Sequence, residues 1–392
     1  MKFKTLSDFV VQGKKVVVRA DLNVPLFQGQ ITDNSRILAV LPTLQELLEK
    51  GASVILISHL GRPKNREAEF SLRPVAEEIK QLLSPSSFYF AETLEEAQLH
   101  STRLKPGYVM MMENLRFYAE EEENDKAFSQ KLAQLGDIYV NDGFSVSHRA
   151  HASVEGITHF LPSCAGRLLE SELTHLEKFL THPRPPVVAI LGGSKISTKL
   201  GLIKNLLPKV NTLLIGGGMA GTLLSAQGIS VGASLQEPQM KDEALSLLRL
   251  AQQKKCEIVL STDVMVATHP DTVEGKRLCS VHDIADHEMI MDVGPETIAL
   301  FQQKLKNAKT VVWNGPLGRV EVPSFAQGTE SVAQFLAQQK DMITVSGGGD
   351  TVAILNKLGL VERFSYVSLS GGAFLEWLEG KVLPGLVALE NA

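Results

Sequence analysis

The stretch LPTLQELLEKGASVILIS, residues 41–58, contains the structural unit from which the fold follows. Its leucines recur with helical spacing as far as Lys50, and Gly51 stands where a glycine commonly ends a helix. Residues 53–58 then form a short, continuous apolar run, which predicts a strand buried on both faces. A helix followed at once by such a strand is typical of a parallel sheet that is covered by helices.

The same alternation continues in both directions along the 392 residues. Strands are predicted at 15–19, 53–58, 108–112 and 138–141 in the first half, and at 187–191, 212–215, 258–260, 310–313, 343–346 and 366–370 in the second. Helices are predicted at 41–50, 72–83, 126–135, 243–255, 296–306 and 325–338. We therefore predict an α/β fold with two doubly wound parallel-sheet (Rossmann-like) domains joined by a hinge helix.

The boundary between these domains is predicted near the middle of the chain. Residues 165–180 carry a helical stripe of apolar side chains, and the segment THPRPP, residues 181–186, cannot continue a helix. We interpret the pair as a hinge element, and an ordinary helix–strand loop is the alternative. The predicted domains are residues 1–168 and 185–380, with 169–184 as hinge helix and linker.

The composition is that of an ordinary globular protein, with 44% hydrophobic and 21% charged residues. A net charge of -5 gives no general attraction to nucleic acid or to an anionic membrane, so neither is an expected partner. The three cysteines are far apart and form no CxxC pair, which suits a reducing cytosol. No apolar run approaches the roughly 20 residues needed to span a bilayer. We expect a soluble, cytoplasmic protein.

Basic residues follow the predicted strands of the first half. In doubly wound sheets the ligand crevice lies beyond the carboxyl ends of the strands, so the fold would gather these residues. A single arginine there is usually a surface residue or half of an ion pair, but arginines at four successive strand ends favour a ligand site. Guanidinium groups match carboxylate and phosphate oxygens, which predicts a small, multiply anionic ligand. Asp21 and Asn23 are candidates for binding its hydroxyl groups.

Glycine clusters follow three predicted strands of the second half, at 192–193, 216–218 and 347–349. Glycine lets a phosphate approach the backbone, and a following helix N-terminus offers free N–H groups. Lys195 and Lys199 supply positive charge, and Asp350 suits Mg²⁺ beside phosphates. No G-x-x-x-x-G-K-[ST] run occurs, so the pattern indicates a nucleotide site of a type other than the Walker P-loop.

A dinucleotide-binding site is an alternative interpretation of one glycine cluster. Gly216, Gly218 and Gly221 satisfy GxGxxG after a strand, the pattern of NAD-dependent dehydrogenases. The pattern also calls for an acidic residue about 20 positions further on, at the end of a second strand. Glu237 has nearly that spacing but lies in SLQEP, which is not the end of an apolar run.

Many segments, in order, resemble phosphoglycerate kinase over essentially the whole chain. They are RADLNVP (19–25), the segment 41–63, ENLRF (113–117), YVNDGFSVSHRAHAS (139–153), AILGGSKISTKL (189–200), LLIGGGMAGTLL (213–224), VVWNGPLG (311–318), FAQGT (325–329), SGGGDT (346–351) and LEGKVLPGL (378–386). The resemblance implies Mg²⁺-dependent, reversible transfer between 1,3-bisphosphoglycerate and ADP, giving 3-phosphoglycerate and ATP in glycolysis. It also implies a monomer that closes about its hinge, with residues 381–392 folding back onto the first domain.

The resemblance assigns roles to individual residues of this sequence. The transferred group would be stabilised by Arg36, Lys195, Lys199, Gly371 and Gly372. The triose would be bound by Asp21, Asn23, Arg36, His59, Arg62, Arg116 and Arg149. The nucleotide would be bound by Lys195, Lys199, Gly217, Asn314, Pro316, Glu321, Gly348, Gly349, Asp350 and Thr351, with Asp350 toward Mg²⁺. No general base is required, because the attacking carboxylate is already ionised at pH 7.

The sequence departs from the family pattern at a few positions. Residues 368–373 read SLSGGA where the family has STGGGA, which leaves a non-catalytic ligand-binding relative as a further alternative. The family's Gly-Val-Phe-Glu reads Gly318-Arg319-Val320-Glu321, which places an arginine beside the expected nucleotide site. The remaining departures are Gly143, Ser145 and Thr262.

Overall fold

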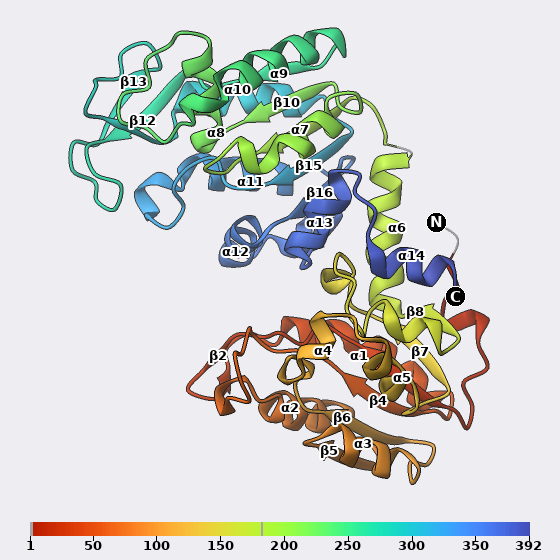
Figure 1. Ribbon diagram of the computed structural model, residues 1–392. Helices are drawn as coiled ribbons and strands as arrows, with labels where there is room; N and C mark the ends of the chain where they lie inside the picture. The colour runs from red at the N-terminus through yellow and green to blue at the C-terminus, as the bar shows by residue number, and fades with distance from the viewer. Residues whose placement is uncertain (1–2, 182) are drawn as a thin grey trace. The chain divides into compact units, whose positions relative to one another are not determined.

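The computed structural model describes residues 3–181 and 183–392, which divide into two compact units (Figure 1). The first unit comprises the residues up to Thr174 together with Val382–Ala392, and the second unit comprises His175–Lys381. Residues 1 and 2 of the predicted first domain and His182 of the predicted linker lie outside the described residues. The division between the units falls within helix α6 (Arg167–Thr181).

The first unit is built on one sheet of six parallel strands. Their order is β5 (Ser87–Ala91), β6 (Tyr108–Met112), β4 (Ser53–Ile57), β1 (Lys15–Arg19), β7 (Ile138–Asn141) and β8 (Ser163–Ala165). Arg19, the last residue of β1, is in register with Ile57 on one side and with Asn141 on the other. The carboxyl ends of these three central strands therefore lie side by side.

Helices cover both faces of this sheet. Val16 and Val18 pack in one core with residues of α1 (Ser35–Glu49) and α2 (Arg73–Leu83). Val17, which points the opposite way, packs in a second core with residues of α3 (Leu94–Ser101) and α5 (Lys126–Ala133). Because successive side chains of β1 enter different cores, its central residues Val16–Val18 are all apolar, as the sequence predicted.

Helix α1 begins earlier than predicted, at Ser35 rather than at residue 41. Ile37 and Val40 extend the buried stripe upstream of Pro42, which lies inside the helix. The helix ends at Glu49, and Gly51 has the left-handed φ of +75° expected of a glycine after a helix. The earlier start places Arg36 in the first turn of α1.

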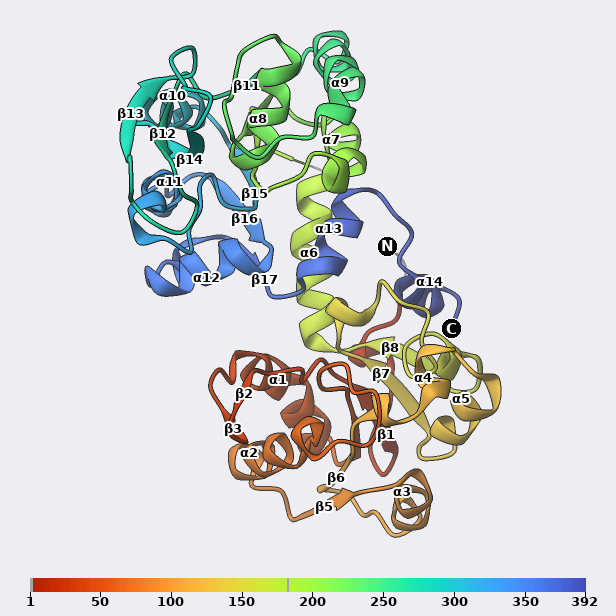
Figure 2. The same cartoon turned by 60° about the vertical axis from the view of Figure 1, so that its left-hand side comes forward.

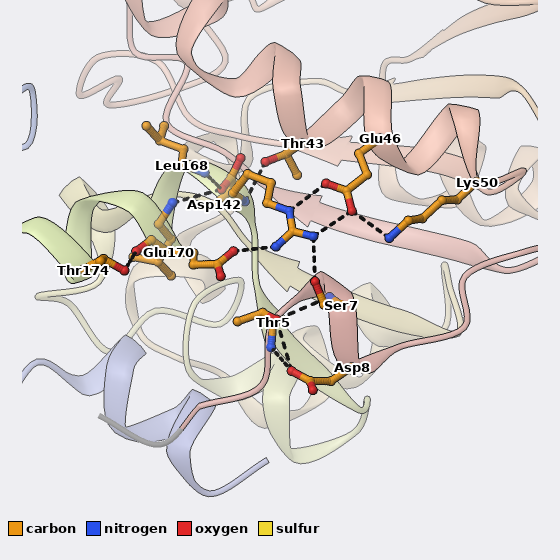
Figure 3. A network of polar contacts seen from close by, with 12 residues as sticks. Thr5, Ser7, Asp8, Thr43, Glu46, Lys50, Asp142, Leu168, Glu170 and Thr174 are labelled. Atoms are coloured by element: carbon orange, nitrogen blue, oxygen red, sulfur yellow. Dashed lines mark hydrogen bonds and ion pairs between the residues drawn. The ribbon is translucent and has the colours of Figure 1, made fainter.

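Helix α6 begins on a dense polar network of the first unit (Figure 3). Arg167 donates to both carboxylate oxygens of Glu46 at 2.6 and 2.8 Å, to Glu170 at 2.6 Å and to Ser7 at 2.9 Å. Hydrogen bonding from Arg167 is the main reason that the pKa of Glu46 falls to about 2. These bonds connect the start of α6 to α1 and to the turn at Leu6–Asp8.

The C-terminal segment belongs to the first unit. Helix α14 (Pro384–Glu390) donates from the backbone N–H of Gly385 to the carbonyl of Ser147 at 2.9 Å, and Lys4 Nζ donates to the carbonyl of Ala392 at 2.9 Å. A Cβ on Gly385 would lie 2.7 Å from a methyl carbon of Val154, so the close approach of α14 requires glycine at this position.

The second unit also has a sheet of six parallel strands. Their order is β11 (Glu257–Val259), β10 (Thr212–Ile215), β9 (Val187–Leu191), β15 (Thr310–Asn314), β16 (Ile343–Gly347) and β17 (Tyr366–Ser368). The chain order reverses between β9 and β15, and such a switch point is where doubly wound sheets bind ligands. The predicted fold class is confirmed, with two parallel sheets of six strands each.

Helices accompany this sheet as well. One core joins its strands to α10 (Pro295–Lys306), α11 (Gln327–Ala337) and α12 (Gly349–Lys357). Helix α7 (Leu200–Leu206) contacts α13 (Gly371–Leu378), which contacts β16. Helix α8 (Gly217–Ala226) packs against α9 (Lys241–Gln253). No helix among residues 3–181 and 183–392 has the length and apolar character needed to cross a membrane.

A small antiparallel sheet in the second unit was not predicted from the sequence (Figure 2). It consists of β13 (Arg277–Ser280), β12 (Asp263–Ala267) and β14 (Met289–Val293). Two residues of β13 are exposed, so this strand lacks the continuous apolar run that marks the parallel strands. Its neighbours form a separate small core with Leu224 of α8 and Val231.

Candidate active site

Two of the predicted triose ligands form an ion pair beyond the carboxyl ends of the first unit's strands. Arg36, from the first turn of α1, pairs with Asp21, which follows β1. Ser145 donates to the same carboxylate oxygen of Asp21, and the N–H of Asn23 donates to its other oxygen at 3.1 Å. Burial raises the pKa of Asp21, but the charge of Arg36 and these hydrogen bonds keep it below its usual value. Asp21 is therefore an anion that orients Arg36.

His59 lies in a buried network behind this pair. Its Nδ1 is 3.2 Å from Nη2 of Arg19, whose side chain is 1% exposed. Arg19 also donates from Nε to Ser153 at 2.9 Å, and Ser153 donates to Glu121 at 2.5 Å. Burial and the charge of Arg19 lower the pKa of His59 to about 3, so its ring is neutral at pH 7. Arg19, the first of the arginines at strand ends, is therefore buried and hydrogen-bonded within the protein, and it is not an exposed anion ligand.

The other predicted arginines differ in how firmly they are placed. Arg116 is half-buried and donates to the carbonyl of Gly61 at 3.0 Å, and the N–H of Gly61 donates to Oδ1 of Asn23 at 2.8 Å. These bonds connect Asn23, which follows β1, with Arg116, which follows β6. Arg62 and Arg149 have exposed side chains. The structure thus fixes Asp21, Asn23, Arg36, His59 and Arg116 through hydrogen bonds.

Lys199 occupies the switch point of the second unit. Its Nζ donates to the carbonyl of Gly192 at 2.6 Å and to Oδ1 of Asn314 at 2.5 Å. Asn314 in turn donates from Nδ2 to the carbonyl of Gly347 at 2.8 Å. Burial lowers the pKa of Lys199 to about 8, although the charge of Asp350 opposes this shift. The ends of β9, β15 and β16 are therefore joined around one partly desolvated cation.

Glycines allow the loops at these strand ends to pack backbone against backbone. A Cβ on Gly192 would overlap the carbonyl of Pro316, and one on Gly217, where φ is +66°, would lie 2.7 Å from the carbonyl oxygen of Gly193. By contrast, a Cβ on Gly349 or Gly371 would meet no atom within 4 Å. These two glycines open α12 and α13, so both helix N-termini present backbone to open space.

A pocket of about 440 Å³ lies beside the switch point, within the second unit. Its lining combines glycine loops and Asp350 with a group of apolar side chains. Such a combination suits a nucleotide, whose phosphates need N–H groups and whose base needs an apolar slot. The lining residues are Gly193, Ser194, Gly217, Gly218, Ala233, Leu235, Pro270, Met289, Ile290, Met291, Pro316, Leu317, Gly318, Arg319, Glu321 and Asp350.

Several predicted nucleotide ligands line this pocket, and others lie elsewhere in the unit. Gly217, Pro316, Glu321 and Asp350 belong to its wall. Lys195 is exposed. Thr351 is buried and accepts the N–H of Gly315 at 2.8 Å, and a Cβ on Gly348 would lie 2.6 Å from Nδ2 of Asn314. Thr351 therefore holds the loop after β15 in place.

Sequence reasoning missed the apolar wall and the residue that supports it. Asp292 of β14 is 1% exposed and accepts the N–H groups of Gly328 at 2.8 Å and Val293 at 2.9 Å. A Cβ on Gly318 would overlap its carboxylate, so loop and carboxylate are in close contact. Burial raises the pKa of Asp292 to about 7. The three residues before Asp292, Met289–Met291, line the pocket, and no motif in the sequence pointed to them.

The acidic residue considered for the dinucleotide pattern has a structural role. Glu237 accepts the Oγ–H of Ser197 at 2.6 Å and the backbone N–H of Ser197 at 3.0 Å. It thereby fixes the turn at Ser197–Lys199 that carries Lys199. Its carboxylate oxygens are both used within the protein, which disfavours a role in binding a ribose.

Asp350 is the residue available to a metal ion. Its carboxylate is exposed in the first turn of α12, at the wall of the pocket. Across the described parts of the chain, no three His, Cys, Asp or Glu side chains are grouped in a way that could hold a metal. A single carboxylate fits Mg²⁺, because this ion is commonly bound by one or two carboxylates together with substrate phosphates and water.

Comparisons with known proteins all identify phosphoglycerate kinases as relatives of this chain. Residues 6–381 match the family model described as phosphoglycerate kinase. The phosphoglycerate kinase of Azorhizobium caulinodans is 49% identical over 397 residues, with 99% of each chain covered. That of Herpetosiphon aurantiacus is 50% identical, with 100% of each chain covered. The structure of phosphoglycerate kinase from Coxiella burnetii superimposes with a TM-score of 0.92 at 41% identity, covering 100% of this chain and 99% of that one.

Proposed function

The chain belongs to the phosphoglycerate kinase family, and we propose that it transfers a phosphoryl group reversibly between 1,3-bisphosphoglycerate and ADP, forming 3-phosphoglycerate and ATP. The observation that carries this proposal is the position of Lys199, a desolvated cation at the switch point of the second sheet. It lies among glycine loops and close enough to Asp350 for their charges to interact.

The first unit is proposed to bind the triose. Arg36, held by Asp21, and Arg116, held through Gly61, would pair with its phosphate and carboxylate oxygens. Asp21 and Asn23 would contact its hydroxyl group. His59 would contribute hydrogen bonds rather than charge, because its ring is neutral. Arg62 and Arg149, whose side chains are exposed, would join the site when the ligand is bound.

The second unit is proposed to bind the nucleotide in the 440 Å³ pocket. The loops that contain Gly217 and Gly349 would meet the phosphates, and the apolar wall would hold the base. Lys195, Asn314, Pro316, Glu321, Gly348 and Thr351 complete the proposed nucleotide ligands. Mg²⁺, held by Asp350 and the phosphates, would neutralise phosphate charge.

The proposed reaction needs positioning and charge more than proton transfer. In the ATP-consuming direction a carboxylate oxygen of 3-phosphoglycerate bonds to the γ-phosphorus, and the bond from that phosphorus to the bridging oxygen of ADP breaks. Arg36, Lys195 and Lys199 would stabilise the charge on the moving group. The backbone N–H groups of Gly371 and Gly372 would do the same, because the Leu369 and Ser370 departures leave the backbone donors in place.

The two substrates are assigned to different units, so transfer requires the triose and nucleotide to be brought together. We propose that a hinge movement does this and excludes water during the reaction. We also propose that the enzyme acts in glycolysis as a cytoplasmic monomer. Family membership supports the place in glycolysis and the monomeric state.

The test is transfer activity of the purified protein with 3-phosphoglycerate, ATP and Mg²⁺, with the acyl phosphate trapped by hydroxylamine. We expect trapped product that disappears with EDTA and falls strongly in Lys199→Ala. Binding of both substrates without any product would refute the kinase and favour a non-catalytic relative altered at residues 368–373. Hydride transfer with NAD in place of phosphoryl transfer would revive the dehydrogenase interpretation.

A further inference from the structure

Arg319 lies at the apolar part of the nucleotide pocket. Its backbone N–H donates to the carbonyl of Met291 at 2.8 Å, and its Nη2 pairs with Asp271 at 2.5 Å. Met291 and Pro270, the neighbour of Asp271, both line the apolar wall. Arg319 is therefore next to apolar lining residues, where the proposed function puts the base.

We propose that Arg319 is a specificity-determining residue of this pocket and raises its selectivity for a 6-oxopurine base relative to a 6-aminopurine base. The proposal rests on the proposed function, because it assumes that the pocket holds the nucleotide. The residue is one of the departures from the family pattern, which has valine at this position. A valine would continue the apolar wall and offer no hydrogen bond to the edge of a base.

The chemical basis is the pattern of donors and acceptors on the two bases. A guanidinium group offers donors only. Guanine presents two adjacent acceptors, O6 and N7, which match two N–H groups of an arginine. Adenine presents the acceptor N7 beside the amino donor N6, so one half of the same edge opposes a guanidinium group. An arginine at the base edge therefore gains a hydrogen bond to O6 of guanine and faces an unfavourable donor at N6 of adenine.

Arg319 lines the pocket, and the protein does not use all the donors of its side chain. Among the described residues, the only hydrogen bond of its guanidinium group is the one from Nη2 to Asp271. Its Nε is screened from solvent and has no hydrogen-bond partner within the described parts of the chain. An atom that water cannot reach is also out of reach of a base, so the donors left for a ligand are those on Nη1 and the second N–H of Nη2. Asp271 pairs with one side of the planar group and leaves the other side available.

The other charged residues of the pocket do not supply this selectivity. Glu321 and Asp350 both line the wall, but carboxylates accept hydrogen bonds and would pair with hydroxyl groups, amino groups or a metal ion. Arg319 is the one cationic side chain among the lining residues described for this pocket. A preference for acceptors at the base edge is therefore attributable to Arg319.

The experiment compares kcat/KM for GTP, ITP and ATP, with 3-phosphoglycerate and Mg²⁺, in the wild type and in Arg319→Val. We expect the GTP-to-ATP ratio to fall about five- to tenfold in the variant, the size of one charge-assisted hydrogen bond in a partly exposed site. ITP should follow GTP, because hypoxanthine keeps O6 and N7 but lacks the 2-amino group. Asp271→Asn should lower the ratio by a smaller factor, because it removes the anchor and leaves the guanidinium group.

Arg249→Val is the matched control, because Arg249 is an exposed arginine on α9 of the same unit and does not line the pocket. It should leave the ratio unchanged. Transfer with both nucleotides and an unaltered ratio in folded Arg319→Val would overturn the assignment of Arg319. The assignment would also be overturned if Arg319→Val lowered the GTP-to-ATP ratio but not the ITP-to-ATP ratio. Recognition would then involve the 2-amino group, which only guanine carries. Failure of the wild type to use any of the three nucleotides would instead refute the proposed function.

Discussion

Nζ of Lys199 lies 2.5 Å from Oδ1 of Asn314, so a lysine from the loop after β9 is fixed by the last residue of β15. The two strands are neighbours in the sheet, and the chain order reverses between them. Burial of the ammonium group lowers its pKa to about 8. Lys199 is therefore held rigidly and incompletely solvated, which are the two properties that make a cation effective toward a moving phosphoryl group.

Replacement of Lys199 by alanine should lower turnover by roughly 10²–10³-fold, the effect of one lost charge-stabilising donor. Lys204→Ala is a suitable control, because Lys204 is an exposed lysine on α7. Steady-state rates with 3-phosphoglycerate, ATP and Mg²⁺ would measure the difference. Wild-type turnover in a folded Lys199→Ala protein would remove Lys199 from the mechanism.

The pKa of Lys199 predicts an alkaline limit to activity. The side chain is a cation below pH 8 and becomes neutral above it, so kcat/KM for MgATP should decline as the pH rises through about 8. Arginine stays charged throughout this range. A pH profile of Lys199→Arg should therefore lack the alkaline decline, whatever its absolute rate. If both profiles decline alike, another group titrates there.

Arg36→Ala should also lower turnover by roughly 10²–10³-fold, because it removes a proposed contact with the transferred group. Its loss also leaves Asp21 buried without its cation, so the pKa of Asp21 should rise. Calorimetry should find weaker binding of 3-phosphoglycerate but unchanged binding of MgADP, because Arg36 belongs to the first unit. A variant with weakened MgADP binding would contradict this division of ligands.

Asp350→Asn should raise the Mg²⁺ concentration that gives half-maximal activity, because the neutral amide is a poorer ligand for a hard cation. Activity without any metal should be lost in both proteins, as an EDTA titration would show. The exposed Asp242 on α9 provides a control as Asp242→Asn, which should keep the wild-type requirement. An identical Mg²⁺ dependence in Asp350→Asn would show that the metal is bound elsewhere.

Asp292 should make folding stability fall as the pH rises toward neutrality. Its folded-state pKa is raised to about 7, mainly by burial, so between pH 4 and 7 the folded protein holds a proton that the unfolded chain has lost. Stability from this group is greatest at acid pH and decreases until about pH 7. Asp292→Asn removes the titration, so its Tm relative to the wild type should increase by several degrees between pH 5 and pH 8. A constant difference in Tm would contradict the raised pKa.

The sequence predicted the elements that depend on local pattern. Gly51 ends α1 in the left-handed conformation, and Val16–Val18 face two cores because a continuous apolar run marks a doubly covered strand. The start of α1 was missed because the apolar stripe passes upstream of Pro42, where a helix is usually interrupted. Fold class therefore followed from periodicity, whereas element bounds depended on tertiary burial.

The candidate site was predictable only in its charged and glycine-rich parts. Asp21 and Arg36 were identifiable because charged residues near strand ends are gathered by the fold, and their ion pair shows that they are neighbours. The apolar wall was not identifiable, since Leu235 and Met289 are ordinary apolar residues until a turn and a small antiparallel sheet bring them to the same pocket. The catalytic and binding roles remain predictions to be tested by the variants above.

The discontinuity of the first unit affects the order in which a ribosome can complete the molecule. Residues up to Thr174 emerge before the second unit, but Val382–Ala392 emerge after it, and only then can Gly385 donate to Ser147 and Leu389 reach its buried position. The second unit is one uninterrupted insertion, His175–Lys381. The second unit, although it is synthesised later, can therefore finish folding first, because the first unit is incomplete until α14 has been synthesised.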